Sequence, residues 1–134
     1  MWVEANSGSG GGGGGETETT LWTNPRPTNS FNGTIVELSD SYTNYKKIGF
    51  YYKDSYSSNN ETVTFYNKEE IDKWYDVGTY FVGAIAAIGS GSFYARYIRA
   101  YTVGTQFQFS SAYKLGATTG STNYCIPTKI TGIN

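Results

Sequence analysis

Beyond residue 18, the chain alternates between short stretches of mixed apolar and polar residues and turns rich in Pro, Gly, Asn and Ser. The clearest stretch places Ile48, Phe50 and Tyr52 on one face. An alternation with a period of two is typical of a strand that is buried on one face. The pattern predicts strands over residues 19–23, 33–39, 45–53, 61–66, 80–88, 93–102, 105–113 and 124–133.

About eight strands separated by turns predict an all-β fold, either an antiparallel β-sandwich or a jelly-roll-like barrel. We expect Val63 and Phe65 to point inward, and the nearly continuous apolar run over 80–88 predicts a strand buried on both faces. Pro127 places the last strand at a sheet edge or at a strand start. Residues 68–76 have the composition of a single helical turn or of an edge strand.

The first 18 residues differ from the rest. Residues 7–15 read SGSGGGGGG, a stretch with no side chain that could join a core. Two interpretations stay open: a flexible tether, or a tightly packed polyglycine stem in which several chains meet, because only Gly allows backbones to approach so closely. The residues before it lack the basic and apolar regions of a signal peptide. We therefore expect a Gly-rich linker or stem end over 1–18 and a β-sandwich domain over 19–134.

The composition excludes several classes of function. The 134-residue chain has no His, a single Cys and a net charge of -1. Without His, Ser–His and Cys–His catalytic pairs and most catalytic zinc sites are excluded, and the charge argues against non-specific nucleic-acid binding. The apolar run over 80–88 is too short to span a bilayer. We expect no catalytic residue, metal, cofactor, nucleic acid or membrane insertion, and a buried, unpaired thiol at Cys125.

A first candidate ligand site lies around Trp74 and Tyr75. Recognition of a saccharide without His or metal needs aromatic faces for the sugar C–H edges and polar side chains for the hydroxyls. Asp72, Lys73 and Asp76 supply polar groups beside these two aromatic residues. The alternative is that Trp74 anchors the core or a subunit interface.

A second candidate combines Tyr51 and Tyr56 with the loop residues Asn59 and Asn60. Loops rich in Tyr, Ser and Asn offer adaptable contacts for a ligand. The alternative is an ordinary polar hairpin loop. Trp22, in an alternating stretch before a Pro-rich turn, is expected in the core.

The charges are unevenly distributed along the chain. All 11 acidic residues and six basic ones lie at or before Asp76, and four basic residues follow, so the two segments carry about -5 and +4. Either cross-strand pairs within one domain or contacts between neighbouring copies explain this split. Arg96 and Arg99, on opposite faces of one strand, are the candidate interface residues. Within one domain, their expected partners are Glu37, Glu61 or Asp54.

Three segments, taken in order, resemble a known family. They are TTLWTNPRPTNSF with the following GTIVELSDSYTNY, the strand IGFYYK, and the end YARYIRAYTVGTQFQFSSAYKLG…YCIPTKITGIN. The chain over about 19–134 resembles the C-terminal domain of tail-fibre or receptor-binding proteins of phages and prophages of gut Firmicutes. Family members end on Ile-Pro-aromatic-Lys-Ile-Tyr-Gly-Ile. The residues that match this ending are Ile126, Pro127, Lys129, Ile130, Gly132 and Ile133, whereas Thr128 and Thr131 replace the aromatic residues.

This resemblance implies a virion protein at the end of a tail or head fibre, acting outside the cell after synthesis in the host cytoplasm. It implies a homotrimer that contacts other virion proteins and binds a polysaccharide or protein receptor on the bacterial surface, without catalysis. The residues 1–18 would then be the end of the fibre stem. Two alternatives remain: a structural head-fibre, capsid-decoration or trimerisation module, and a small glycan-cleaving enzyme.

Overall fold

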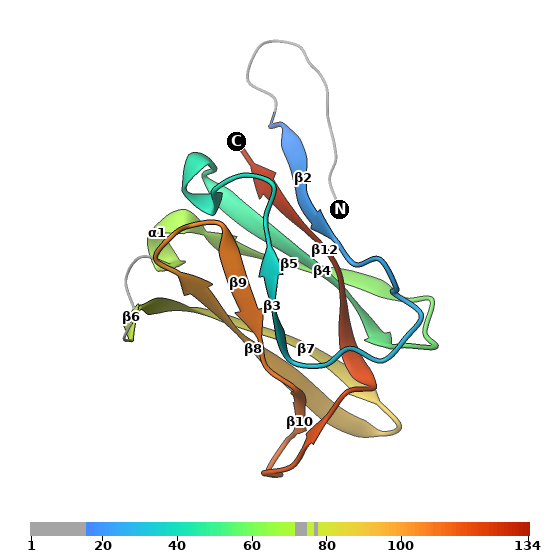
Figure 1. Cartoon of the computed structure of the whole chain (residues 1–134). Coiled ribbons are helices and arrows are strands. Elements are labelled where there is room, and N and C mark those ends of the chain that lie inside the picture. The colour runs from blue at the N-terminus through green and yellow to red at the C-terminus, as the bar shows by residue number, and fades with distance from the viewer. Residues whose placement is uncertain (1–15, 72–74, 77) are drawn as a thin grey trace.

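The computed structural model describes residues 16–71, 75–76 and 78–134. Its strands form two sheets that pack face to face, and all pairings are antiparallel (Figure 1). The prediction of an all-β antiparallel sandwich is confirmed for this part of the chain. The four-stranded sheet has the order β2 (Glu18–Thr23), β12 (Tyr124–Ile133), β4 (Lys47–Ser55) and β5 (Glu61–Asn67).

The second sheet is built around the long hairpin of β7 and β8. One path through it runs β11 (Gly120–Ser121), β10 (Ala112–Lys114), β8 (Ser92–Tyr101), β7 (Thr79–Gly89) and β6 (Tyr75–Asp76). The later half of β8 also pairs with β9 (Gln106–Phe109), which in turn pairs with β3 (Thr34–Glu37). A short 3-10 helix, η2 (Tyr42–Asn44), follows β3, and a single turn, α1 (Lys68–Ile71), follows β5. Residues 68–76 thus contain both predicted elements, the helical turn and a strand.

Aromatic rings from both sheets meet in the core. The ring of Phe50 on β4 lies 5.2 Å from Phe107 and 6.2 Å from Phe109 on β9, both in edge-to-face arrangements. Such pairs stabilise a core beyond the area that they bury. Trp22 packs at the core margin against Phe31 and Phe109, as predicted for a core residue.

The two ends of the domain lie together. The backbone of Thr17 exchanges two hydrogen bonds with that of Asn134, with N···O distances of 2.9 and 3.0 Å. The first strand begins at Glu18, one residue before the predicted start. The C-terminal end of β12 therefore lies beside the beginning of β2, at the top of Figure 1.

The faces of β5 are opposite to the prediction. Tyr66 pairs with Ile48 and Thr64 pairs with Phe50, so Tyr66 and Thr64 point into the core and Val63 and Phe65 point outward. The Tyr66 hydroxyl crosses to the other sheet, where it donates to the Ala84 carbonyl at 2.7 Å and accepts from the Ala84 amide at 2.9 Å. Because β5 carries large residues on both faces, the alternation alone does not show which face points into the core.

Two further predictions about strands are wrong. The run over 80–88 is not buried on both faces, because Phe81 is 44% exposed and Ile88 is 67% exposed on the outer face of β7. The stretch predicted as one strand over 105–113 is divided into β9 and β10.

The last strand is interior to its sheet, although Pro127 predicted an edge or a strand start. Pairing of β12 with β2 begins at Lys129, so at Pro127 the neighbouring strand is β4. A register shift between Pro127 and Lys129 follows in the β4 ladder. Pro127 has no amide N–H to donate, and it lies where β12 has no partner in β2. The reason for the prediction therefore holds, although the strand is not at a sheet edge.

Candidate functional site

A polar cleft of about 420 Å³ lies at one end of the four-stranded sheet, where β2 and β4 end and β5 and β12 begin. This volume is within the range of small-ligand sites. The residues that line it are mostly polar or charged: Thr23, Asn24, Pro27, Lys53, Ser58, Asn59, Glu61, Thr128 and Lys129.

The cleft lies far from the end of the domain that follows the Gly-rich segment. Glu18 pairs with Ile133, and Thr23, on the cleft wall, pairs with Lys129. Thr23 lies five residue steps along β2 from Glu18, a distance of roughly 17 Å. A ligand in the cleft would thus meet the end of the sandwich opposite to the Thr17–Asn134 contact.

Lys53 holds two walls of the cleft together. Its ammonium donates to the carbonyls of Pro27 and Tyr56, each at 3.2 Å. An ammonium has three N–H donors, so one remains for a ligand. Lys53 is also the Cα partner of Glu61 in the β4–β5 ladder, yet the two charges form no salt bridge in the described structure.

The carboxylate of Glu61 is held by a hydroxyl instead of a cation. Its Oε2 accepts a hydrogen bond from Thr128 Oγ1. The other lysine of the cleft, Lys129, places its ammonium 4.4 Å from the centroid of the Tyr51 ring, an attractive cation–π geometry. The cleft thus carries two cations and one carboxylate, none of them in a salt bridge within the described part of the chain.

Tyr51 connects this cleft to the outer face of the sheet. Its hydroxyl donates to Glu18 Oε2 at 2.5 Å, and the same oxygen accepts from Thr131 Oγ1 at 2.7 Å. Burial, followed by the hydrogen bond to Glu18, raises the pKa of Tyr51. The phenol therefore stays neutral and fixed, and its ring supports the Lys129 ammonium.

Some polar groups of the cleft are consumed in building its walls, whereas others are free. Asn24 is buried, donates from Nδ2 to the Pro127 carbonyl at 2.8 Å and accepts from the Arg26 amide at 2.8 Å. The side chains of Thr23 and Asn59 form no hydrogen bond with the described residues. Together with Glu61 and the two lysines, they are the groups that can contact a ligand.

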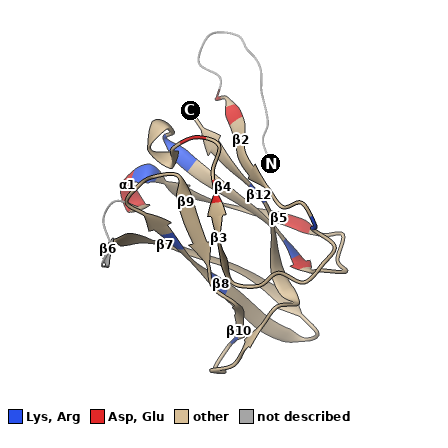
Figure 2. Ribbon diagram, viewed as in Figure 1, with Lys and Arg blue, Asp and Glu red and all other residues tan. Residues whose placement is uncertain are grey.

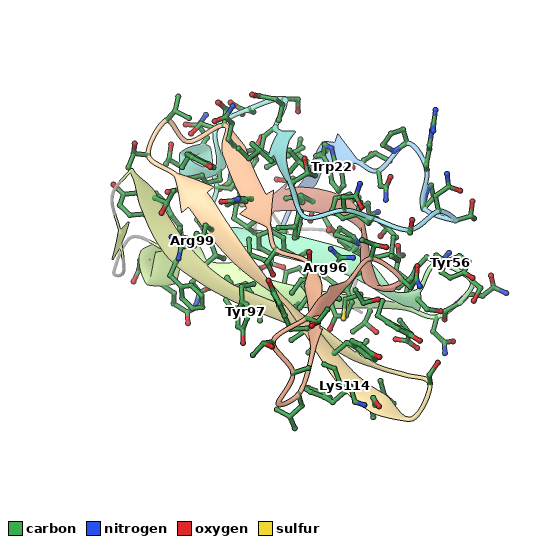
Figure 3. The ribbon with its side chains drawn as sticks, turned by 60° about the horizontal axis from the view of Figure 1, so that its bottom comes forward. Trp22, Tyr56, Arg96, Tyr97, Arg99 and Lys114 are labelled. Atoms are coloured by element: carbon green, nitrogen blue, oxygen red, sulfur yellow. The ribbon has the colours of Figure 1, made fainter. Side chains whose placement is uncertain are left out.

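The structure brings part of the second predicted site to this cleft. Asn59 lines it, and Tyr56, 43% exposed, lies on the adjoining β4–β5 loop (Figure 3). Asn60 is on the same loop but its side chain donates to Asp54 at 3.4 Å. Tyr51 does not line the cleft itself, but its ring contacts the ammonium of Lys129, which does.

The first predicted site cannot be placed. Asp72 and Trp74 lie outside the described residues, as does the side chain of Tyr75. The backbone of Tyr75, in β6, pairs with that of Tyr80 in β7. Among the described residues, no three acidic, Cys or His side chains converge as a metal site would require. None of the described helices has the length and apolar character needed to cross a membrane.

Of the two candidate interface residues, Arg96 is not at the surface. Its side chain is 0% exposed and lies between the sheets, whereas Arg99 is exposed on the opposite face of β8 (Figure 3). The guanidinium of Arg96 donates to three backbone carbonyls and not to Glu37, Glu61 or Asp54. The expectation that Arg96 contacts a neighbouring copy or an acidic side chain is therefore wrong, because the group is used inside the domain.

A second surface is the outer face of β7 and β8, on which Arg99 is the charged residue that these two strands supply among the described residues (Figure 2). Phe93 is 47% exposed and Tyr97 is 51% exposed there, beside the outward-facing Ile88. The ring of Tyr97 lies 6.5 Å from that of Tyr113 on β10, and both line a groove of about 460 Å³ that Lys114 and the turn after it also line. This face is apolar and aromatic, in contrast to the polar cleft.

The sequence did not identify Lys53, Lys129 and Glu61 as site residues. Each stands on an alternating strand, where a charged residue is typical of a solvent-exposed face. They become neighbours only through the register of β12 on β4 and of β4 on β5. The one local signal was the polar loop containing Asn59, which was recognised.

Compared with known proteins, the chain matches no family model and no curated protein.

Proposed function

We propose that this chain is the head domain of a phage fibre, which attaches the virion to its host by binding a surface saccharide without catalysis. The observation that carries the proposal is the polar cleft at the end of the sandwich opposite to the Thr17–Asn134 contact. The resemblance of residues 19–134 to fibre proteins supplies the biological setting. A domain joined to a stem through its N-terminal end would present this cleft to the cell surface.

The chemistry of the cleft supports a saccharide. Sugar hydroxyls need both donors and acceptors, which the Asn59 amide, the Thr23 hydroxyl and the Glu61 carboxylate provide. The exposed ring of Tyr56 on the adjoining loop offers an apolar face to the sugar C–H groups. Binding without cleavage is supported because Glu61 is the one carboxylate among the lining residues, whereas glycoside hydrolysis normally uses a pair.

A binding screen tests this proposal. The full chain is applied to immobilised bacterial surface polysaccharides, next to a double variant, Thr23→Val with Asn59→Ala. Asn32→Ala, in an exposed loop outside the cleft, is the matched control. We expect the wild-type chain and the control to bind at least one polysaccharide, and the double variant to bind it about tenfold more weakly. Binding that survives the double variant, or no binding at all, would contradict the proposal.

The apolar outer face of β7 and β8 favours a second candidate function, a structural module that joins copies of this chain in the virion. Large exposed apolar patches are uncommon on soluble monomers. Phe81, Ile88, Phe93 and Tyr97 supply it from two adjacent strands. The two functions are compatible, because the cleft and this face are formed by different sheets. Light scattering on the full chain distinguishes an assembly from a monomer.

A further inference from the structure

The charges of the cleft narrow the class of saccharide, on the assumption that the proposed function holds. We propose that the cleft binds an anionic saccharide, a sugar or polyol chain carrying carboxylate or phosphate groups, whose charge lies between Lys53 and Lys129. The inference is based on the contacts of these two lysine side chains and of the Glu61 carboxylate beside them.

Neither lysine is neutralised within the described chain. Lys53 uses two of its three donors on backbone carbonyls, and Lys129 rests on the uncharged ring of Tyr51. Lysines on strands commonly pair with an acid across the ladder, and Lys47 on β4 forms a salt bridge with Glu16, which precedes β2, at 3.2 Å. The cleft departs from this pattern, because Glu61 stands opposite Lys53 but accepts its hydrogen bond from Thr128.

This arrangement fixes the cations before a ligand arrives. The Lys53 ammonium is held by the carbonyls of Pro27 and Tyr56, and the Lys129 ammonium by the Tyr51 ring, itself anchored to Glu18. A ligand then loses less free energy in ordering these long side chains than it would with free lysines. Fixed ammonium groups without carboxylate partners favour an anion.

Glu61 distinguishes an anionic saccharide from a simple anion. A carboxylate disfavours a small, fully charged ion beside it, but it accepts hydrogen bonds from hydroxyl groups. A ligand with a charge at the lysines and hydroxyls at Glu61 and Asn59 satisfies all of these groups at once. Uronate polymers and polyol phosphates share this chemistry.

The test compares charged and neutral forms of the same ligands on the full chain. The probes are oligogalacturonate and its carboxyl-reduced, neutral form, poly(glycerol phosphate) and free glycerol, and neutral dextran, galactan and mannan. Binding is followed through the amide signals of the labelled protein. Lys129→Gln removes one cleft cation, and Lys114→Gln, on the exposed end of β10, removes an equal charge elsewhere.

We expect at least one charged probe to bind about tenfold more tightly than its neutral counterpart, with a loss of similar size in Lys129→Gln but not in Lys114→Gln. Added salt should weaken this binding. The carboxylate and phosphate arms identify the source of the charge.

Neutral polysaccharides that bind the cleft as tightly as charged ones, with no effect of Lys129→Gln, would overturn this inference and leave the proposed function standing. If none of the charged or neutral probes bound, both would be overturned.

Discussion

Arg96 contacts Phe31 in two ways. Its Nη2 donates to the Phe31 carbonyl at 2.7 Å, and the guanidinium carbon lies 5.3 Å from the centroid of the Phe31 ring. The other nitrogens reach the carbonyls of Ser110 at 2.9 Å and Tyr124 at 3.1 Å. One buried side chain thus connects the loop before β3, the link between β9 and β10, and the first residue of β12.

We expect Arg96→Met to lower the free energy of unfolding by about 3 kcal/mol or more, because it leaves three inward-facing carbonyls without a donor. Arg96→Lys should recover only part of the loss, since one ammonium cannot span three separate carbonyls. Urea unfolding measures both variants. Arg99→Gln, on the exposed face of the same strand, is the control, with an expected loss below about 1 kcal/mol. Equal losses for the two positions would contradict the assigned role of Arg96.

The alternation of side chains predicted most of the strands. The inward residues of β4, Ile48, Phe50 and Tyr52, are all buried, and Arg96 and Arg99 lie on opposite faces of β8 as expected. In β4 one face carries the larger apolar residues, so the period of two identifies the inner face. β5 has large residues on both faces, and only its pairing with β4 determines that Tyr66 points inward.

Other features depend on groups that no local pattern reveals. Arginine in a strand is usually exposed, and the burial of Arg96 requires three backbone carbonyls brought together from distant segments. The cleft likewise depends on the register of β12 beside β4, which places Lys129 near Lys53. The loop containing Asn59 was predictable because its polar composition is visible in one short segment. Lys53, Glu61 and Lys129 were not, because only strand pairing brings them together.

Gly83 makes room for Tyr66 to cross between the sheets. A Cβ at this position would lie 2.4 Å from the Tyr66 ring and hydroxyl, which bond to Ala84. We expect Gly83→Ala to lower the free energy of unfolding by about 2–3 kcal/mol, because Tyr66 must move and lose both hydrogen bonds. A double-mutant cycle with Tyr66→Ala isolates this contact. If the glycine substitution costs as much in the Tyr66→Ala background, the contact is not the cause.

The outer face of β7 and β8 predicts self-association. Ile88 and Phe93 are partners across the hairpin and both are exposed. We expect the full chain to show a solution mass of at least two chains of 14.7 kDa each, because association would remove these side chains from water. The double variant Ile88→Lys with Phe93→Glu keeps the net charge and should reduce the mass to one chain.

Val103→Lys provides the control for this experiment. Val103 is 64% exposed in the turn after β8, away from the paired strands of the outer face. Its substitution should leave the mass unchanged. A wild-type chain that is monomeric at about 0.1 mM, well above the dissociation constants of most stable assemblies, would contradict the structural role of this face.

The stability of the domain should depend on pH through Cys125. This thiol is buried and donates to the Tyr94 carbonyl, with an S···O distance of 3.3 Å. Burial raises the pKa of Cys125 from 9.0 to about 11. Between these values the folded chain binds more protons than the unfolded chain, so the free energy of unfolding falls as the pH rises.

The loss from this single group should reach about 1.4 kcal/mol by pH 10, one unit above the pKa of the thiol in the unfolded chain. Cys125→Ser keeps a donor for the Tyr94 carbonyl but does not titrate in this range, so its stability should stay flatter between pH 8 and pH 10. Burial also raises the pKa of Tyr45 and Tyr94 from 10.0, which affects both proteins alike. Urea unfolding at several pH values gives the two curves. If they run parallel, ionisation of Cys125 does not limit the alkaline stability of the fold.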